Sequence, residues 1–177
     1  MNRRLLIIVL MACLLPLGMQ AQQGTFRFAQ LTDIHLTPNN PNPTEDLLRS
    51  VAQINATDSI DFVLVTGDLT EEGDRTTMEK VKSCLDLLKV PYHVVLGNHE
   101  TKWSDSGCTA FGEIFGGERF EFEHKGFLFL GFNSGPLMRM AYGHVVPQDI
   151  RWMTEEMDKK RQRQTGDTCH PLPANGR

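Results

Sequence analysis

The sequence has few cysteines, no excess of positive charge, and no apolar run long enough to make a good membrane span. Its four cysteines form no Cys-x-x-Cys pair, which argues against a zinc knuckle. A formal net charge of −4 argues against binding to a nucleic acid polymer. No internal repeat or low-complexity segment is present. The 177 residues therefore indicate one domain that can bury a core.

An apolar run from Leu5 to Leu17 follows two arginines and precedes the small residue Ala21. This order is typical of a secretory signal peptide over residues 1–21. It predicts a periplasmic or secreted protein with no transmembrane segment in the mature chain. Lipoprotein anchoring at Cys13 is the weaker alternative, because the apolar segment before Cys13 is very short. Loss of the two arginines takes the formal charge from −4 to −6.

Three cysteines remain after this cleavage, namely Cys84, Cys108 and Cys169. The sequence leaves open whether Cys84 and Cys108 pair in an oxidising compartment. Cys84 lies within a series of apolar residues at helical spacing, which favours a buried thiol.

Three apolar runs, over residues 26–31, 62–65 and 92–96, predict β-strands. The second run contains no polar residue, which indicates burial on both faces, as in a parallel sheet. A helix is expected between the first two strands and a second helix over residues 74–88. This β-α-β-α-β order predicts a parallel sheet of the α/β class, in which ligands bind beyond the carboxyl ends of the strands.

The first of these helices has an expected N-cap at Asn42, followed by Pro43 and by Glu45 as the partner in a capping box. Its buried stripe is expected to contain Leu47, Leu48, Val51 and Ile54.

The second half of the chain differs from the first. Residues 108–115 predict a short helix that ends at two glycines, and residues 120–123 and 127–132 predict an antiparallel hairpin. A last helix is expected from Pro147 to about Arg163, with Ile150, Met153 and Met157 on its apolar face.

Polar side chains follow each of the three predicted parallel strands. Asp33 and His35 come after the first strand, and we expect extended backbone there to turn both toward one side. Asp68 follows the second strand within a Gly-Asp pair. A Gly-Asn-His-Glu motif that contains Asn98 and His99 follows the third. Each motif alone fits an ordinary turn, but all three at the same sheet edge predict a metal site.

These motifs resemble those of the calcineurin-like metallophosphoesterases: Asp-x-His, then Gly-Asp-x-x-Asp/Glu, here residues 67–71, then Gly-Asn-His-Asp/Glu, here residues 97–100. The sequence of residues 30–36, Gln-Leu-Thr-Asp-Ile-His-Leu, is most similar to the corresponding motif of the cyclic-nucleotide phosphodiesterase branch of this family. The resemblance implies a sandwich in which the parallel half is followed by the antiparallel hairpin and helix.

The resemblance also implies roles for individual residues. Asp33 and His35 would hold one divalent metal ion, Asp68 would bridge two, and Asn98 would hold the second. His99 would assist catalysis, with Glu71 orienting it. The implied reaction is hydrolysis of a small phosphoester, a diester or a monoester, by hydroxide that bridges two Mn, Fe or Zn ions.

Three other histidines receive structural interpretations: His93 within a strand, His124 at the hairpin turn, and His144 before the last helix.

The family pattern continues with another histidine and a Gly-His-x-His motif, which this sequence does not contain. We therefore interpret residues 22–163 as the N-terminal part of a metallophosphoesterase domain whose C-terminal strands are missing. Residues 164–177 are expected to be irregular and are interpreted as a truncated or frameshifted tail. An impaired hydrolase is the leading hypothesis. A non-catalytic remnant that binds a metal or a partner is the alternative, and an α/β protein without metal ranks last. The sequence does not specify the substrate, the metal or the oligomeric state.

Overall fold

The computed structural model describes residues 24–102, 104, 106–135 and 142–165. The expected signal peptide, Cys13, Cys169 and the tail beyond residue 165 lie outside these residues. Within the described part, no helix has both the length and the apolar character needed to cross a membrane.

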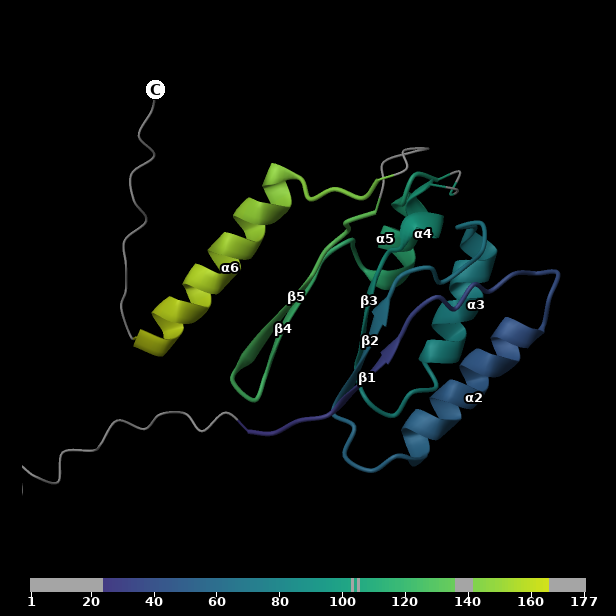
Figure 1. Cartoon of the computed structure of the whole chain (residues 1–177), viewed down its shortest axis with the longest axis horizontal. Coiled ribbons are helices and arrows are strands. Elements are labelled where there is room, and N and C mark those ends of the chain that lie inside the picture. Colours follow the sequence, from purple (N-terminus) through teal and green to yellow (C-terminus); the bar gives the residue numbers. More distant parts are fainter. Residues whose placement is uncertain (1–23, 103, 105, 136–141, 166–177) are drawn as a thin grey trace, which may run out of the picture.

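A parallel sheet forms the centre of the fold (Figure 1). It contains β1 (Phe28–Leu31), β2 (Phe62–Thr66) and β3 (Tyr92–Val95) in the order β1-β2-β3. The central strand is the most deeply buried, with Phe62, Val63 and Val65 almost fully covered. The predicted α/β fold with a parallel half is therefore confirmed, and β1 begins two residues later than expected.

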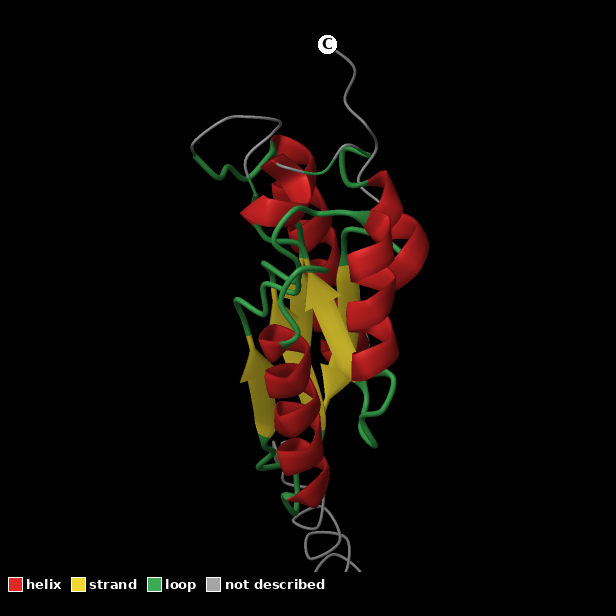
Figure 2. Cartoon of the chain, turned by 90° about the vertical axis from the view of Figure 1, so that its right-hand side faces the viewer, coloured by secondary structure: helices red, strands yellow, loops and turns green. Residues whose placement is uncertain are grey.

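Helices cover one face of this sheet (Figures 1 and 2). They are α2 (Asn42–Ala56), α3 (Arg75–Leu85) and α5 (Thr109–Phe115). Their buried side chains, among them Leu47, Val51, Met78 and Val81, form one apolar cluster with β2. Cys84 belongs to this cluster, which confirms the buried thiol. Cys84 and Cys108 are both free, so no disulfide joins them.

Two predictions about the helix boundaries are wrong. The N-cap of α2 is Pro41 rather than Asn42, and no side-chain cap is present. The reason is that the carbonyl of Pro41 accepts the first helical bond from Glu45, while the side chain of Asn40 accepts the amide of Asn42. The helix α3 ends at Leu85, three residues before the expected end.

The face of the sheet opposite the helices packs against a hairpin of β4 (Phe120–His124) and β5 (Phe127–Gly131). The rings of Phe122 and Phe129 each lie 5.0 Å from the ring of Phe62. The predicted hairpin is therefore confirmed, and aromatic side chains join its inner face to the parallel sheet.

The long helix α6 (Pro147–Thr165) lies on the outer side of the hairpin (Figure 1). The predicted apolar face is wrong, because Ile150 and Met157 are 52% and 54% exposed. Ionic contacts hold the helix instead: Lys160 and Arg163 both bind the carboxylate of Glu123 on β4.

Leu48 on α2 is also more exposed than expected, at 38%.

Candidate metal centre

The three motif loops leave the carboxyl ends of β1, β2 and β3 at the same edge of the sheet (Figure 1). Main-chain hydrogen bonds join the first two loops. The amide of Asp33 donates to the carbonyl of Gly67 at 3.3 Å, and the amide of His35 donates to the carbonyl of Asp68 at 3.0 Å. The loop after β3 begins the short helix α4 (Asn98–Lys102), which the sequence did not predict.

The structure brings two overlapping groups of metal-ligating side chains together. One contains Asp33, His35 and Asp68, and the other contains His35, Glu71 and His99. Within each group, one ligand atom per residue lies within 4.8 Å of the others. The Nε2 atom of His35 is 3.9 Å from Oδ1 of Asp33. His35 therefore connects the two groups.

Asp33, His35 and Asp68 all adopt left-handed backbone conformations, with φ of 53°, 50° and 51°. The expectation of extended backbone at Asp33 and His35 is therefore wrong. Asp33 and His35 lie beside the loop of Asp68 because their amides donate to the carbonyls of Gly67 and Asp68. Non-glycine residues with positive φ are uncommon and are often found at functional sites.

Two glycines allow the second and third loops to touch. A Cβ atom on Gly97 would lie 2.1 Å from Oδ1 of Asp68. A Cβ atom on Gly67 would lie 2.6 Å from the Cα atom of Gly97. No side chain fits at either position, so these glycines are required for Asp68 to reach the loop that contains His99.

The side-chain carboxylate of Glu100 also joins the loop that follows β2 to the loop that follows β3. Glu100 is fully buried. Its Oε1 accepts from the amide of Thr70 at 3.0 Å and from its hydroxyl at 3.2 Å, and its Oε2 accepts from the amide of Gly97 at 2.9 Å. No role was predicted for Glu100. The available signal was its place at the end of the Gly-Asn-His-Glu motif.

Glu71 contacts both histidines, through different groups. Its carboxylate lies 3.0 Å from Nδ1 of His35, and its main-chain carbonyl lies 2.5 Å from Nδ1 of His99. A carbonyl can only accept, so His99 has its proton on Nδ1 and leaves Nε2 free. The orientation of His99 that was expected from Glu71 thus comes from the main chain, while the carboxylate orients His35.

Asp68 and Asn98, the other two predicted ligands, differ in their contacts. The Oδ1 atom of Asp68 accepts the amide of His99 at 3.1 Å, which attaches α4 to the site. Asn98 is the exposed first residue of α4. Among the described residues, its side-chain amide makes no hydrogen bond to the other predicted ligands.

The other described histidines lie elsewhere. The ring of His93 stacks on Phe122 at 3.8 Å, and burial lowers its pKa. His124 approaches Asp61 at 3.1 Å, at the turn of the hairpin. His144 lines a separate cavity.

A family model described as calcineurin-like phosphoesterase matches residues 26–168. A 3',5'-cyclic-nucleotide phosphodiesterase of a Nostoc species is 24% identical over 136 residues, which are 73% of this chain and 50% of that protein. A probable cyclic nucleotide phosphodiesterase of Rhodopseudomonas palustris is 33% identical over 97 residues, 51% of this chain and 33% of that protein.

Human tartrate-resistant acid phosphatase type 5 is 29% identical over 120 residues, which are 61% of this chain and 37% of that protein. The chain thus spans half or less of the length of each of these relatives.

Proposed function

The chain belongs to the calcineurin-like phosphoesterase family, and from this premise we propose that it hydrolyses small phosphoesters at a site for two divalent metal ions. The main support is the convergence of Asp33, His35 and Asp68 within 4.8 Å at the carboxyl edge of the parallel sheet. The names of the relatives include both phosphodiesterases and a phosphatase, so diesters and monoesters both fit.

The donor set suits such ions. Carboxylate oxygens and imidazole nitrogens are ligands that Mn, Fe and Zn accept. The Nδ1 atom of His35 is bound to the carboxylate of Glu71, which leaves Nε2 beside Asp33 free to ligate. Asp68 would bridge the two ions, and Asn98 would supply an amide oxygen to the second. When bound, two such ions lower the pKa of water and neutralise phosphate charge.

The protein's own groups then position and protonate the substrate. Because Nδ1 of His99 keeps its proton on a carbonyl, only Nε2 can give a proton to the departing alcohol oxygen, and it does so from the imidazolium form, in which both ring nitrogens are protonated. The bond from the amide of His99 to Asp68 fixes the distance between this imidazole and the ligand group.

A second candidate function is metal binding without turnover. It is favoured by one observation: His93, His124 and His144 all lie outside the centre, so no third imidazole joins His35 and His99 among the described residues. Fewer ligands mean weaker binding and less charge compensation at the centre. A domain of this kind could still bind a metal or a partner.

The test uses Asp68→Asn, with Asp58→Asn on the exposed segment before β2 as the matched control. We expect the full chain to bind Mn²⁺ in calorimetry and to hydrolyse bis-(p-nitrophenyl) phosphate, and only Asp68→Asn to abolish both. Mn²⁺ binding without hydrolysis would support the second candidate. If the unmodified chain does not bind Mn²⁺ at millimolar concentration, both candidates are wrong.

A further inference from the structure

The loop that follows β5 packs directly against the short helix α4. A Cβ atom on Gly135, in this loop, would lie 2.8 Å from both Oγ1 and Cγ2 of Thr101. Thr101 is a buried residue of α4, and its hydroxyl donates to the carbonyl of Asn98 at 3.3 Å. His99 lies between these two residues of the helix. The loop after β5 therefore contacts the element that contains the proposed proton donor.

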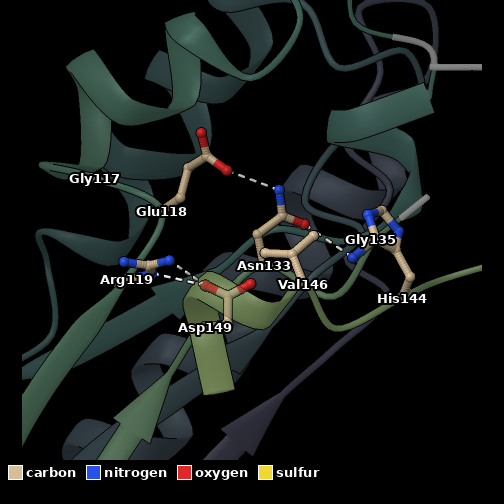
Figure 3. A pocket seen from close by; sticks show the side chains of 8 residues that line it. All are labelled: Gly117, Glu118, Arg119, Asn133, Gly135, His144, Val146 and Asp149. Atoms are coloured by element: carbon tan, nitrogen blue, oxygen red, sulfur yellow. Dashed lines mark hydrogen bonds and ion pairs between the residues drawn. The ribbon is translucent and has the colours of Figure 1, made fainter. Parts of the chain in front are cut away.

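Hydrogen bonds oppose any movement of this loop away from α4. The side chain of Asn133 lies between Glu118 and Gly135 (Figure 3). Its amide group donates to Oε2 of Glu118 at 2.8 Å, and its oxygen accepts the amide of Gly135 at 2.9 Å. The carbonyl of Ser134 accepts the amide of His144 at 3.1 Å. The loop is thus joined to the segment before β4 and to the segment before α6.

The side chain of Thr101 has little freedom to avoid a larger residue at position 135. It is buried, and threonine is branched at Cβ, which restricts its χ1 rotamers. The helix is also closely packed at another point, because a Cβ atom on Gly73 would lie 2.7 Å from the carbonyl oxygen of His99. Gly135 itself does not have a positive φ. A side chain at this position is therefore excluded mainly by Thr101 and not by the backbone conformation.

We propose that Gly135 is a positioning residue of the candidate metal centre, because its missing side chain lets the loop after β5 pack against Thr101 and fix α4 with His99 in place. The role of His99 in proton transfer rests on the proposed function, whereas the contact with Thr101 does not. In Gly135→Ala, the added methyl group displaces Thr101 and the residues of α4 before it. The Nδ1 atom of His99 lies 2.5 Å from the carbonyl of Glu71, and a displaced helix weakens this bond and misdirects Nε2.

The first test follows the bond between His99 and Glu71 in the full chain without metal. Nitrogen chemical shifts of the neutral imidazole report which ring nitrogen is protonated. We expect the proton on Nδ1 in the unmodified chain and a loss of this preference in Gly135→Ala. Thr101→Ala removes both atoms that the new methyl group would meet, so Gly135→Ala has no further effect in that background. The matched control is Gly112→Ala in α5, where a Cβ atom meets nothing within 4 Å.

No change in Gly135→Ala, or an equal change with and without the side chain of Thr101, overturns the proposal. If Gly135→Ala alone does not fold, the double variant with Thr101→Ala decides. It folds with the proton of His99 on Nδ1 if the contact with Thr101 is the cause, and failure to do so overturns the proposal.

The second test separates this proposal from the proposed function through the leaving group. Phenol departs slowly unless it receives a proton, whereas p-nitrophenol departs readily as an anion. Where the chain is active, Gly135→Ala lowers kcat for diphenyl phosphate by about tenfold or more and leaves kcat for bis-(p-nitrophenyl) phosphate nearly unchanged. An equal loss on both substrates overturns the role of Gly135 while the hydrolase function stands. A chain that hydrolyses neither substrate, but in which the proton of His99 responds as in the first test, supports the positioning role and contradicts the hydrolase function.

Discussion

Replacing Glu100 with glutamine tests whether one buried carboxylate holds the metal centre together. The carboxylate accepts three hydrogen bonds from two loops, with both oxygens engaged. In Glu100→Gln, one oxygen becomes an NH₂ group that faces either the amide of Gly97 or the donors of Thr70. Two donors then oppose each other in a site without water access.

An unsatisfied buried donor costs about 1–3 kcal/mol, and we expect a loss of ~2 kcal/mol in the free energy of unfolding. For a chain of this size, that corresponds to a fall in Tm of about 4–8 °C. The same change displaces the loop of Asp68 relative to α4, and changes behind metal ligands typically weaken metal affinity about 10–100-fold. Both effects therefore come from one substitution that touches no ligand.

The assays are thermal unfolding followed by circular dichroism and Mn²⁺ titration by calorimetry. The matched control is Glu113→Gln, which removes only the exposed ion pair of Glu113 with Arg75 and is expected to leave the stability nearly unchanged. The reasoning is refuted if Glu100→Gln and Glu113→Gln melt at the same temperature, or if Glu100→Gln loses stability but binds Mn²⁺ as the unmodified chain does.

Two further predictions concern other parts of the fold. Gly97→Ala forces a methyl group against the side chain of Asp68. We expect the free energy of unfolding in urea to fall by about 1–3 kcal/mol and Mn²⁺ to bind more weakly. Unchanged Mn²⁺ binding would contradict the close approach of the two loops. A hydrogen bond from Lys125 lowers the pKa of Asp61 to about 2, so its stabilisation is complete above pH 4 and is lost as the pH falls toward 2. Asp61→Asn is therefore less stable than the unmodified chain in urea unfolding at pH 7 but equally stable near pH 2, and a constant difference at both pH values would be evidence against this ion pair.

The parallel half of the fold could be predicted because its signals are local. The apolar run of residues 62–65 is long enough to mark a strand that is covered on both faces. Residues that directly follow parallel strands meet at one edge, so the positions of Asp33, His35 and Asp68 followed from strand order alone. The geometry of single side chains was not needed for this step.

The contacts of α6 could not be predicted in the same way. Apolar residues at helical spacing usually mark the buried face, and Ile150 and Met157 have that spacing. Burial depends on the neighbouring surface, however, and the outer side of β4 presents the carboxylate of Glu123. Lys160 of α6, whose side chain is only 14% exposed, therefore turns toward the hairpin, and the exposed Arg163 reaches the same carboxylate. This outcome depends on Glu123, which lies 37 residues before Lys160 and 40 residues before Arg163, and no local pattern contains it.

The left-handed backbone conformations of Asp33, His35 and Asp68 show why the detailed geometry of the candidate metal centre could not be predicted from short sequence motifs either. Asp33, His35 and Asp68 each adopt a conformation that costs about 1–2 kcal/mol. Nothing in a short motif compensates for this cost. The compensation comes from main-chain bonds between loops and from the buried carboxylate of Glu100, both of which join segments about 30 residues apart. These bonds involve only protein atoms, so the folded chain itself imposes the strained arrangement. The candidate ligand group is thus preorganised by folding, and under the proposed function a bound metal would add stability to this arrangement.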